Sequence, residues 1–243
     1  MLNFIGRGSA FNTKEGNNCA YIKKDDHLFL IDCGSSTFGR LIESKLLDEV
    51  KQVTVLLTHL HPDHVGSLGD LIFYGYYSMG KLMEPSITVY APYDLKIAEH
   101  LKTMGVERNT YELVQFWGSV GCHHDDFILN FKPICVNHVD ELPCFGYIIK
   151  ICIDGRNNTI YYSGDSNDIP MSILHMLEYG ELDYFYQDTC IADYEKNVHL
   201  SLRKLDESIK QEARHKVFCM HLDEKFDEQK AKDLGFNVVS ITA

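Results

Sequence analysis

The chain has 243 residues, of which 45% are hydrophobic and 24% are charged, as in an ordinary globular protein. Its formal net charge of -12 argues against a long nucleic acid as partner, because surfaces that follow a phosphate backbone are basic. No apolar stretch approaches the length of a membrane span, and the first residues lack the basic start of a secretory signal. The length suits one domain, or two intimate halves. We predict a single cytoplasmic domain over residues 1–243.

Hydrophobic periodicity and turn residues predict the elements of the first half of the chain. In chain order these are a strand over 2–5, a glycine turn over 6–9, hairpin strands over 20–22 and 28–31, a helix over 36–50, a strand over 53–57, a helix over 64–79, a strand over 87–90 and a helix over 93–104.

The second half begins with a run of strands and ends with alternating helices and strands. Strands are predicted over 127–129, 134–136, 147–151, 159–162, 184–186, 217–219 and 238–240, and helices over 170–179, 201–213 and 227–234. Strands dominate the middle and helices flank them. This order predicts an α/β (α+β) protein in which helices cover the outer faces of two packed sheets.

The eight cysteines form no Cys-x-x-Cys pair, and most of them lie beside apolar residues. We therefore expect buried free thiols rather than disulfides or a thiolate zinc site, which fits a reducing compartment.

A His-x-His-x-Asp-His motif directly follows the strand predicted over 53–57. It places His59, His61, Asp63 and His64 in a tight turn, and Pro62 stops the chain from continuing at once as a helix. Zinc prefers imidazole nitrogens and carboxylate oxygens, and manganese binds them somewhat less tightly. A solvated polar turn is the alternative, but it gives little reason to crowd three protonatable rings together. The motif predicts a metal site.

Three further candidate ligands also follow apolar strands. They are His138, Asp165 in the Ser-Gly-Asp sequence, and His221. Taken alone, each histidine would be a turn residue and the aspartate a cap. The same placement at four strand ends favours convergence on one site, since side chains at strand ends can meet at a sheet edge.

This ordered set of residues resembles the metallo-β-lactamase superfamily, in its RNase Z-like branch, over nearly the whole chain. The resemblance implies a four-layer αββα sandwich with two divalent metal ions at the sheet edges. Zinc is the first choice, with manganese or magnesium as alternatives. By the same resemblance one ion is held by His59, His61 and His138 and the other by Asp63, His64 and His221, while Asp165 bridges the two. An aspartate rather than a cysteine at the bridging position favours a phosphodiesterase or thioesterase over a lactamase.

Two other segments carry the RNase Z-like resemblance. His199 is similar to the RNase Z histidine that works with the motif aspartate, here Asp63, as a proton donor; the alternative is a surface histidine before a helix capped by Ser201. Residues 5–11 are similar to the glycine-rich opening of these enzymes, with Arg7 where a small polar residue is commoner. Asp165 follows His138 by only 27 positions, so the long arm that grips tRNA is absent.

Small RNase Z-like proteins without the arm include the anti-Pycsar proteins of phages and bacteria. The resemblance implies a homodimeric phosphodiesterase that hydrolyses 3′,5′-cyclic mononucleotides, such as cyclic CMP and cyclic UMP, and so disables anti-phage signalling. A phage-encoded protein would act in the host cytoplasm on this small anionic nucleotide substrate. The alternatives are an RNase Z-type endonuclease that processes tRNA 3′ ends, a glyoxalase-like thioesterase, and a non-catalytic protein that sequesters a nucleotide.

Aromatic residues gather over 73–77 and 111–117. They could supply a base-stacking wall or a subunit contact, although aromatic residues at these spacings more often belong to a core.

Overall fold

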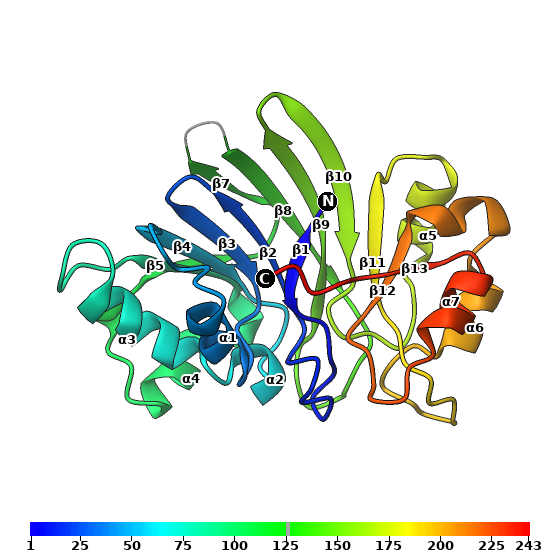
Figure 1. Cartoon of the computed structure of the whole chain (residues 1–243), viewed down its shortest axis with the longest axis horizontal. Helices are drawn as coiled ribbons and strands as arrows, with labels where there is room; N and C mark the ends of the chain where they lie inside the picture. Colours follow the sequence, from blue (N-terminus) through cyan, green and yellow to red (C-terminus); the bar gives the residue numbers. More distant parts are fainter. Residues whose placement is uncertain (125–126) are drawn as a thin grey trace. The chain divides into compact units, whose positions relative to one another are not determined.

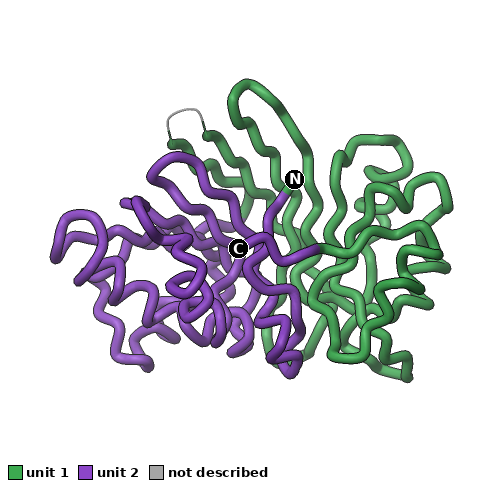
Figure 2. Tube along the Cα trace, in the orientation of Figure 1, with its two compact units in different colours: residues 1, 118–239 green, residues 2–117, 240–243 purple. Residues whose placement is uncertain are grey.

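The computed structural model describes residues 1–124 and 127–243. It divides the chain into two compact units (Figure 2). Unit 1 comprises Met1 and Gly118–Val239, and unit 2 comprises Leu2–Trp117 and Ser240–Ala243. Each unit contains one sheet with its own helices (Figure 1). The two sheets and their helices confirm the α/β class predicted from the order of elements.

The sheet of unit 2 has six strands, in the spatial order in which they follow along the chain. They are β1 (Asn3–Gly6), β2 (Cys19–Lys24), β3 (His27–Ile31), β4 (Gln52–Leu56), β5 (Ile87–Pro92) and β6 (Glu112–Phe116). The pairs β1–β2 and β2–β3 are antiparallel, whereas β3, β4, β5 and β6 run parallel to one another. The carboxyl ends of β3, β4, β5 and β6 therefore lie along one edge of this sheet.

The helices of unit 2 are shorter than the sequence pattern predicts. They are α1 (Thr37–Glu43), α2 (Pro62–Val65), α3 (Leu68–Ser78) and α4 (Ile97–Thr103), with 3-10 turns η1 (Tyr93–Leu95) and η2 (Arg108–Thr110). The helix predicted over 36–50 ends early, because Lys45 and Glu49 have φ of 58° and 65°. The helix predicted over 93–104 is interrupted at Lys96, where φ is 49°. The one predicted over 64–79 is divided at Gly66 and Ser67.

The sheet of unit 1 has seven strands in the order β13-β12-β11-β10-β9-β8-β7. They are β7 (Val120–His124), β8 (Phe127–Cys135), β9 (Phe145–Ile153), β10 (Arg156–Tyr162), β11 (Tyr184–Asp188), β12 (Val217–Met220) and β13 (Asn237–Val238). The strands β10 to β13 are parallel, and β7 to β10 are antiparallel. The strands predicted over 127–129 and 134–136 are the two ends of one strand, β8. Neither β6 nor β7 was predicted.

The helices of unit 1 cover a core built on the strands β10, β11 and β12. They are α5 (Met171–Glu178), α6 (Leu202–Ser208) and α7 (Glu228–Asp233), with the 3-10 segment η3 (Gln211–Lys216). Ile173 of α5 and Leu205 of α6 pack with Tyr161 and Phe185 of the sheet, and all four are fully buried. Ser201 caps α6, since its hydroxyl oxygen accepts a hydrogen bond from the Lys204 amide. The helix predicted over 201–213 is thus α6 followed by η3.

All eight cysteines lie in the described residues, and all are free thiols as predicted. Six of them are buried; Cys135 is exposed and Cys152 is intermediate.

Within residues 1–124 and 127–243, none of the helices has the length and apolar character needed to cross a bilayer.

Candidate metal centre

In unit 2 the His-x-His-x-Asp-His motif lies at the carboxyl end of β4, as predicted. Leu57 and Thr58 lead from the strand into the turn, and Pro62 is the first residue of the short helix α2. Pro62 has no N–H to leave unsatisfied at this position, and its fixed φ suits the first helical turn. Within the turn His59, Asp63 and His64 are buried, so protein contacts rather than solvent hold these three side chains.

The four side chains of the motif form two pairs of donor atoms. His59 Nε2 and His61 Nδ1 are 3.0 Å apart, and His64 Nε2 and Asp63 Oδ2 are 3.4 Å apart. Two nitrogens bound to one tetrahedral zinc ion are separated by about 3.3 Å, given Zn–N bonds of about 2.05 Å. Each pair in unit 2 therefore has the spacing of two ligands of one ion.

A buried carboxylate, Asp32, fixes the orientation of these rings. It follows β3, the strand next to β4, and accepts hydrogen bonds from the amide and hydroxyl of Thr58 and from His64 Nδ1, at 2.8, 2.7 and 2.7 Å. Because the Thr58 hydroxyl donates to Asp32, it accepts from His59 Nδ1, 3.1 Å away. Both imidazoles thus keep Nε2 as the lone-pair nitrogen that a metal requires.

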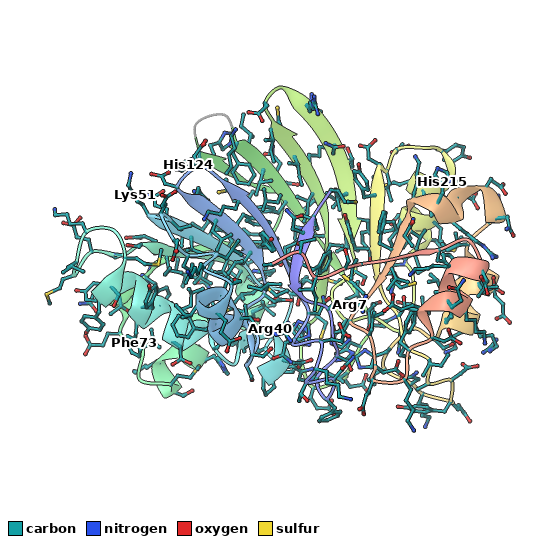
Figure 3. The ribbon with its side chains drawn as sticks, viewed as in Figure 1. Arg7, Arg40, Lys51, Phe73, His124 and His215 are labelled. Carbon is teal, nitrogen blue, oxygen red and sulfur yellow. The ribbon has the colours of Figure 1, made fainter. Side chains whose placement is uncertain are left out.

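One glycine lets a neighbouring loop approach this turn, and a second lets Arg40 pack against the opening segment of the chain. A Cβ on Gly34 would lie 1.9 Å from the carbonyl oxygen of Asp63, so only glycine fits there. Gly16 has φ of 68°, and a Cβ on it would meet Arg40 Nε at 2.2 Å. Arg40 donates to the carbonyls of Ile5 and Lys14 at 3.1 and 2.7 Å, and so closes the glycine-rich opening segment (Figure 3).

Arg7, the unusual residue of that opening segment, is paired with a residue that follows the segment. Its Nε is 2.7 Å from Glu15 Oε2, and its side chain is largely buried (Figure 3). The ion pair with Glu15 gives Arg7 a structural role in the loop that follows β1.

In unit 1 the candidates also lie at strand ends. Asp165 follows β10, and His221 follows β12, whereas His138 follows β8. Asp165 Oδ2 is 3.4 Å from His221 Nε2 and 3.7 Å from His138 Nε2. One carboxylate oxygen therefore faces two imidazole nitrogens at ligand-like distances. His138 Nδ1 donates to the carbonyl of Val198 at 3.0 Å, which leaves Nε2 as its lone-pair nitrogen.

Asp188, the last residue of β11, is the counterpart of Asp32. It accepts from His199 Nδ1 at 2.7 Å and from the Ser166 amide at 3.0 Å, and its other oxygen is 3.3 Å from His221 Nδ1. His221 thus presents Nε2 to Asp165 and Nδ1 to Asp188. Since Asp188 lies on the Nδ1 side of both rings, it positions them and is not itself placed as a ligand.

The two supporting carboxylates have pKa shifts of opposite sign. Burial raises the pKa of Asp32, and the charge of His64 together with the hydrogen bonds from His64 and Thr58 offsets only part of that effect. Burial also acts to raise the pKa of Asp188, but His199 and His221 outweigh it, so this pKa lies below the ordinary value.

His199 has the complementary shift. Burial acts to lower its pKa, but the charge of Asp188 and the hydrogen bond to it raise that pKa above the ordinary value. The ring is therefore suited to hold a proton on Nε2 while Nδ1 donates to Asp188.

Asp32 and His221 share a left-handed backbone, with φ of 67° and 56°. Aspartate and histidine visit this region more readily than most residues, but such a conformation still costs about 1–3 kcal/mol. The surrounding hydrogen bonds hold both residues where they contact the other histidines.

These donor sets fit divalent metal ions. In unit 1, Asp165 and His221 offer ligand atoms within 4.8 Å of each other, and the supporting pair Asp188 and His199 lies within the same distance of both. Buried imidazoles with fixed tautomers beside carboxylates suit zinc, and the oxygen donors also suit manganese. The clusters support the expectation of divalent metals.

The sequence predicted the candidate ligands and His199 but did not point to Asp32 or Asp188. The missed signal is the same one that drew attention to Asp165, an apolar strand followed by aspartate. Both Ile31-Asp32 and the strand that ends at Asp188 have it. The hydrogen bonds that distinguish a supporting carboxylate from a strand cap are visible only in three dimensions.

Comparison with solved structures shows the fold. The metallo-β-lactamase fold protein YhfI from Bacillus subtilis is similar with a TM-score of 0.72 at 18% identity, over 99% of this chain and 95% of that one. This confirms the metallo-β-lactamase fold. Each unit of the present chain supplies one sheet with its helices, as the predicted αββα architecture requires.

Sequence comparisons give two kinds of relative. A ribonuclease Z of Methanococcus maripaludis is 27% identical over 156 residues, which cover 61% of this chain and 48% of that enzyme. An anti-Pycsar protein Apyc1 of Paenibacillus xerothermodurans is 25% identical over 235 residues, which cover 94% of this chain and 90% of that protein. The family model described as anti-Pycsar protein Apyc1 matches residues 1–240. The chain therefore belongs to the anti-Pycsar protein Apyc1 family.

Proposed function

We propose that this protein is a metal-dependent phosphodiesterase that hydrolyses 3′,5′-cyclic mononucleotides, such as cyclic CMP and cyclic UMP, to nucleoside monophosphates. The observation that carries the proposal is the paired geometry of the donors. Unit 2 offers two pairs of ligand atoms, and unit 1 offers one carboxylate oxygen that faces two imidazoles. Two pairs and one shared oxygen are the pattern of a two-metal site.

In this proposal the two units act as one domain over residues 1–243. One ion is held by His59, His61 and His138 and the other by Asp63, His64 and His221, with Asp165 between them. Support comes from the tautomers, since Nδ1 of His59, His64 and His138 faces an oxygen and leaves Nε2 for a metal. Zinc is the first choice, and manganese or magnesium are the alternatives.

Two divalent ions, when bound, would stabilise charge on a phosphodiester and supply a nucleophile from water near neutral pH. Asp63 orients the attacking water in line with the ribose oxygen that leaves. His199, which holds its proton through Asp188, donates that proton from Nε2 to the leaving oxygen. The product is a nucleoside monophosphate. His199 then takes up a proton from solvent and is ready for the next turnover.

The second candidate is an RNase Z-type endonuclease, because a ribonuclease Z is among the relatives. Two features argue against it. The net charge is -12, and residues 138–165 are mostly taken up by β9 and β10, which leaves no arm to grip tRNA. The thioesterase alternative gives no role to the proton-holding His199.

A panel of substrates tests the proposal. The metal-reconstituted protein is incubated with cyclic CMP, cyclic UMP, cyclic AMP and a tRNA precursor, and the products are separated by chromatography. We expect turnover of at least one cyclic nucleotide and none of the precursor. Cleavage of the precursor without any turnover of cyclic nucleotides would identify an RNase Z instead.

A binding protein that only sequesters the nucleotide is separated by Asp63→Ala. If hydrolysis is the function, this variant removes no cyclic nucleotide at catalytic concentrations of protein. If sequestration is the function, the wild type and Asp63→Ala remove the same amount of cyclic nucleotide, in proportion to the amount of protein.

The proposal also includes a homodimer in the cytoplasm, in the host's if the protein is phage-encoded, where hydrolysis would disable cyclic-nucleotide anti-phage signalling. Light scattering should give twice the chain mass of 27.9 kDa. A single chain mass at assay concentration would remove the dimer from the proposal.

A further inference from the structure

Unit 2 exposes two large aromatic side chains that stack on each other. Trp117 is 70% exposed and Tyr93 is 43% exposed. Their ring centroids are 5.0 Å apart with an interplanar angle of 21°. Trp117 is also the only tryptophan of the chain. Aromatic rings are usually buried for their apolar area, so a preformed and exposed stack suggests that another flat group covers it.

The stack lies on the sheet edge that carries the metal-binding turn of unit 2. Tyr93 directly follows β5, and Trp117 directly follows β6, while β4 leads into the turn at Thr58. The three strands are adjacent and parallel, so their carboxyl ends share one edge. The register pairs Leu56 with Tyr90, so Tyr93 begins level with His59.

Strand spacing gives the distance along that edge. Neighbouring strands lie about 4.8 Å apart, so the backbone of Tyr93 starts about 5 Å from the turn and that of Trp117 about 10 Å from it. A phosphate at the turn and a base on the aromatic stack would be joined by one ribose. The span of about 10 Å from β4 to β6 is comparable with the length of a mononucleotide whose phosphate lies at β4 and whose base lies at β6.

The two rings are held by regular structure. Pro92 and Phe116, the residues before them, are partners in the register of β5 and β6, and both are buried. Tyr93 begins the 3-10 turn η1, whose end is fixed by the hydrogen bond from the Lys96 amide to the Tyr93 carbonyl at 3.1 Å. A ring positioned in this way loses little conformational freedom on binding.

We propose that Trp117, backed by Tyr93, is the surface on which the nucleobase of the substrate stacks. This rests on the proposed hydrolysis of cyclic mononucleotides and names the part of the chain that binds the base. Stacking accepts any base because every base has a π face, so this surface contributes affinity and does not select pyrimidines over purines. Truncation of a stacking ring typically weakens binding by about 5- to 150-fold.

The single tryptophan makes a direct binding test possible without turnover. The metal-reconstituted protein is titrated with CMP and, in parallel, with ribose 5-phosphate, which has the phosphate but no base. We expect saturable quenching of Trp117 fluorescence by CMP only. If CMP binds by calorimetry but leaves the emission unchanged, the base lies elsewhere and the inference is overturned.

Kinetics supply the second test. Trp117→Ala should raise KM for a cyclic nucleotide by about 5- to 150-fold with little change in kcat, because the ring does not contact the phosphate. Trp117→Phe should restore most of the affinity, and Tyr93→Ala should have a smaller effect of the same kind. Methyl riboside 3′,5′-cyclic phosphate, which lacks a base, should be hydrolysed equally by wild type and Trp117→Ala.

A matched control is Tyr179→Ala, which removes an aromatic ring that is 78% exposed at the end of α5 in unit 1. Its KM should equal that of the wild type. An unchanged KM in Trp117→Ala would overturn the inference. This holds also if the variant is a monomer where the wild type is a dimer, since Trp117 would then be a subunit contact.

The two proposals fail separately. If the wild type hydrolyses no cyclic nucleotide but CMP still quenches Trp117, the stacking surface stands and the phosphodiesterase proposal is wrong. If the wild type hydrolyses cyclic CMP and Trp117→Ala does so with the same KM, only the stacking surface is wrong.

Discussion

Units 1 and 2 each place a buried aspartate behind histidines of the candidate metal centre, but they use it differently. In unit 2 Asp32 holds His64 directly and His59 through the Thr58 hydroxyl. In unit 1 Asp188 contacts two imidazoles itself, those of His199 and His221. The pKa of Asp32 is raised by burial, whereas the two imidazoles lower that of Asp188 despite equal burial.

The comparison shows what decides the state of a buried carboxylate. Neutral hydrogen-bond donors and one imidazole do not fully offset desolvation, but two imidazoles do. Unit 2 is thus built to orient the rings of His59 and His64, and unit 1 is built to keep a proton on His199 beside an ionised aspartate. The first arrangement suits ligands, and the second also suits acid catalysis.

The strongest test of this comparison removes one ligand from each unit. His59→Ala and His221→Ala should each lower kcat/KM for cyclic CMP by at least about 10³-fold, since a bound ion contributes several kcal/mol to the transition state. Metal content, measured by elemental analysis, should fall in both variants. If only one of the two substitutions reduced activity, the assignment of ligands from both units would be wrong.

Removal of the supporting carboxylates should have smaller and unequal effects. Asp32→Asn and Asp188→Asn keep the shape but lose the charge, and such changes typically cost about 10- to 100-fold in metal affinity or activity. We expect Asp188→Asn to be the more severe, because it affects two rings and the proton on His199. Competition with a chelator measures the metal affinity of each variant. Kinetics at saturating metal measure the loss of activity that weaker metal binding does not explain. Equal losses in both variants would contradict the proposed difference between the units.

The same contrast explains what the sequence revealed. The candidate ligands of unit 2 are close together in the sequence, so His59 to His64 predict a metal-binding turn. The candidate ligands of unit 1 come from the ends of different strands, and His138, Asp165 and His221 were predicted only because the same pattern recurs and resembles a known family. Asp32 and Asp188 were missed because their role lies in contacts with rings distant in sequence.

Secondary structure was predicted best where strands are buried and worst where a single residue changes the backbone. The buried strands β3, β4 and β11 were close to their predicted bounds. The helix predicted over 36–50 was wrong beyond Glu43, because positive φ at Lys45 and Glu49 cannot be read from apolar spacing. The strand β6 was missed because its residues are only partly buried and show no clear alternation. Trp117 follows that strand, so its position on the sheet edge could not be predicted.

The Thr58 hydroxyl tests the link between Asp32 and His59. Thr58→Val keeps the side-chain shape but removes both the hydrogen bond to Asp32 and the acceptor of His59 Nδ1 in a fully buried place, which should lower the free energy of unfolding by about 1–3 kcal/mol. The matched change in unit 1 is Ser163→Ala, which removes the acceptor of the Asp188 amide at 2.9 Å. Urea unfolding of the metal-free variants measures both. No loss of stability in Thr58→Val would show that Asp32 does not depend on this hydroxyl.

The smallest expected effect is the pH dependence of unfolding in the metal-free protein. The pKa of folded His199 is raised above 6.5, so its stabilising contribution is fully present below pH 6.5 and is lost as pH rises through the raised value. The pKa of folded Asp188 lies below 3.8, so its contribution is present above pH 3.8 and is lost as pH falls through the lowered value. The pair therefore stabilises the fold most between pH 3.8 and 6.5.

His199→Asn should lower the free energy of unfolding in that window and approach the wild type at higher pH, measured by urea unfolding at each pH. Asp32→Asn should change in the same direction over a lower pH range: it should gain stability relative to the wild type as pH rises from 3.8, because the raised pKa of Asp32 makes its ionisation cost stability. Parallel curves for wild type and His199→Asn across this range would show that the Asp188–His199 pair does not distinguish unit 1 from unit 2.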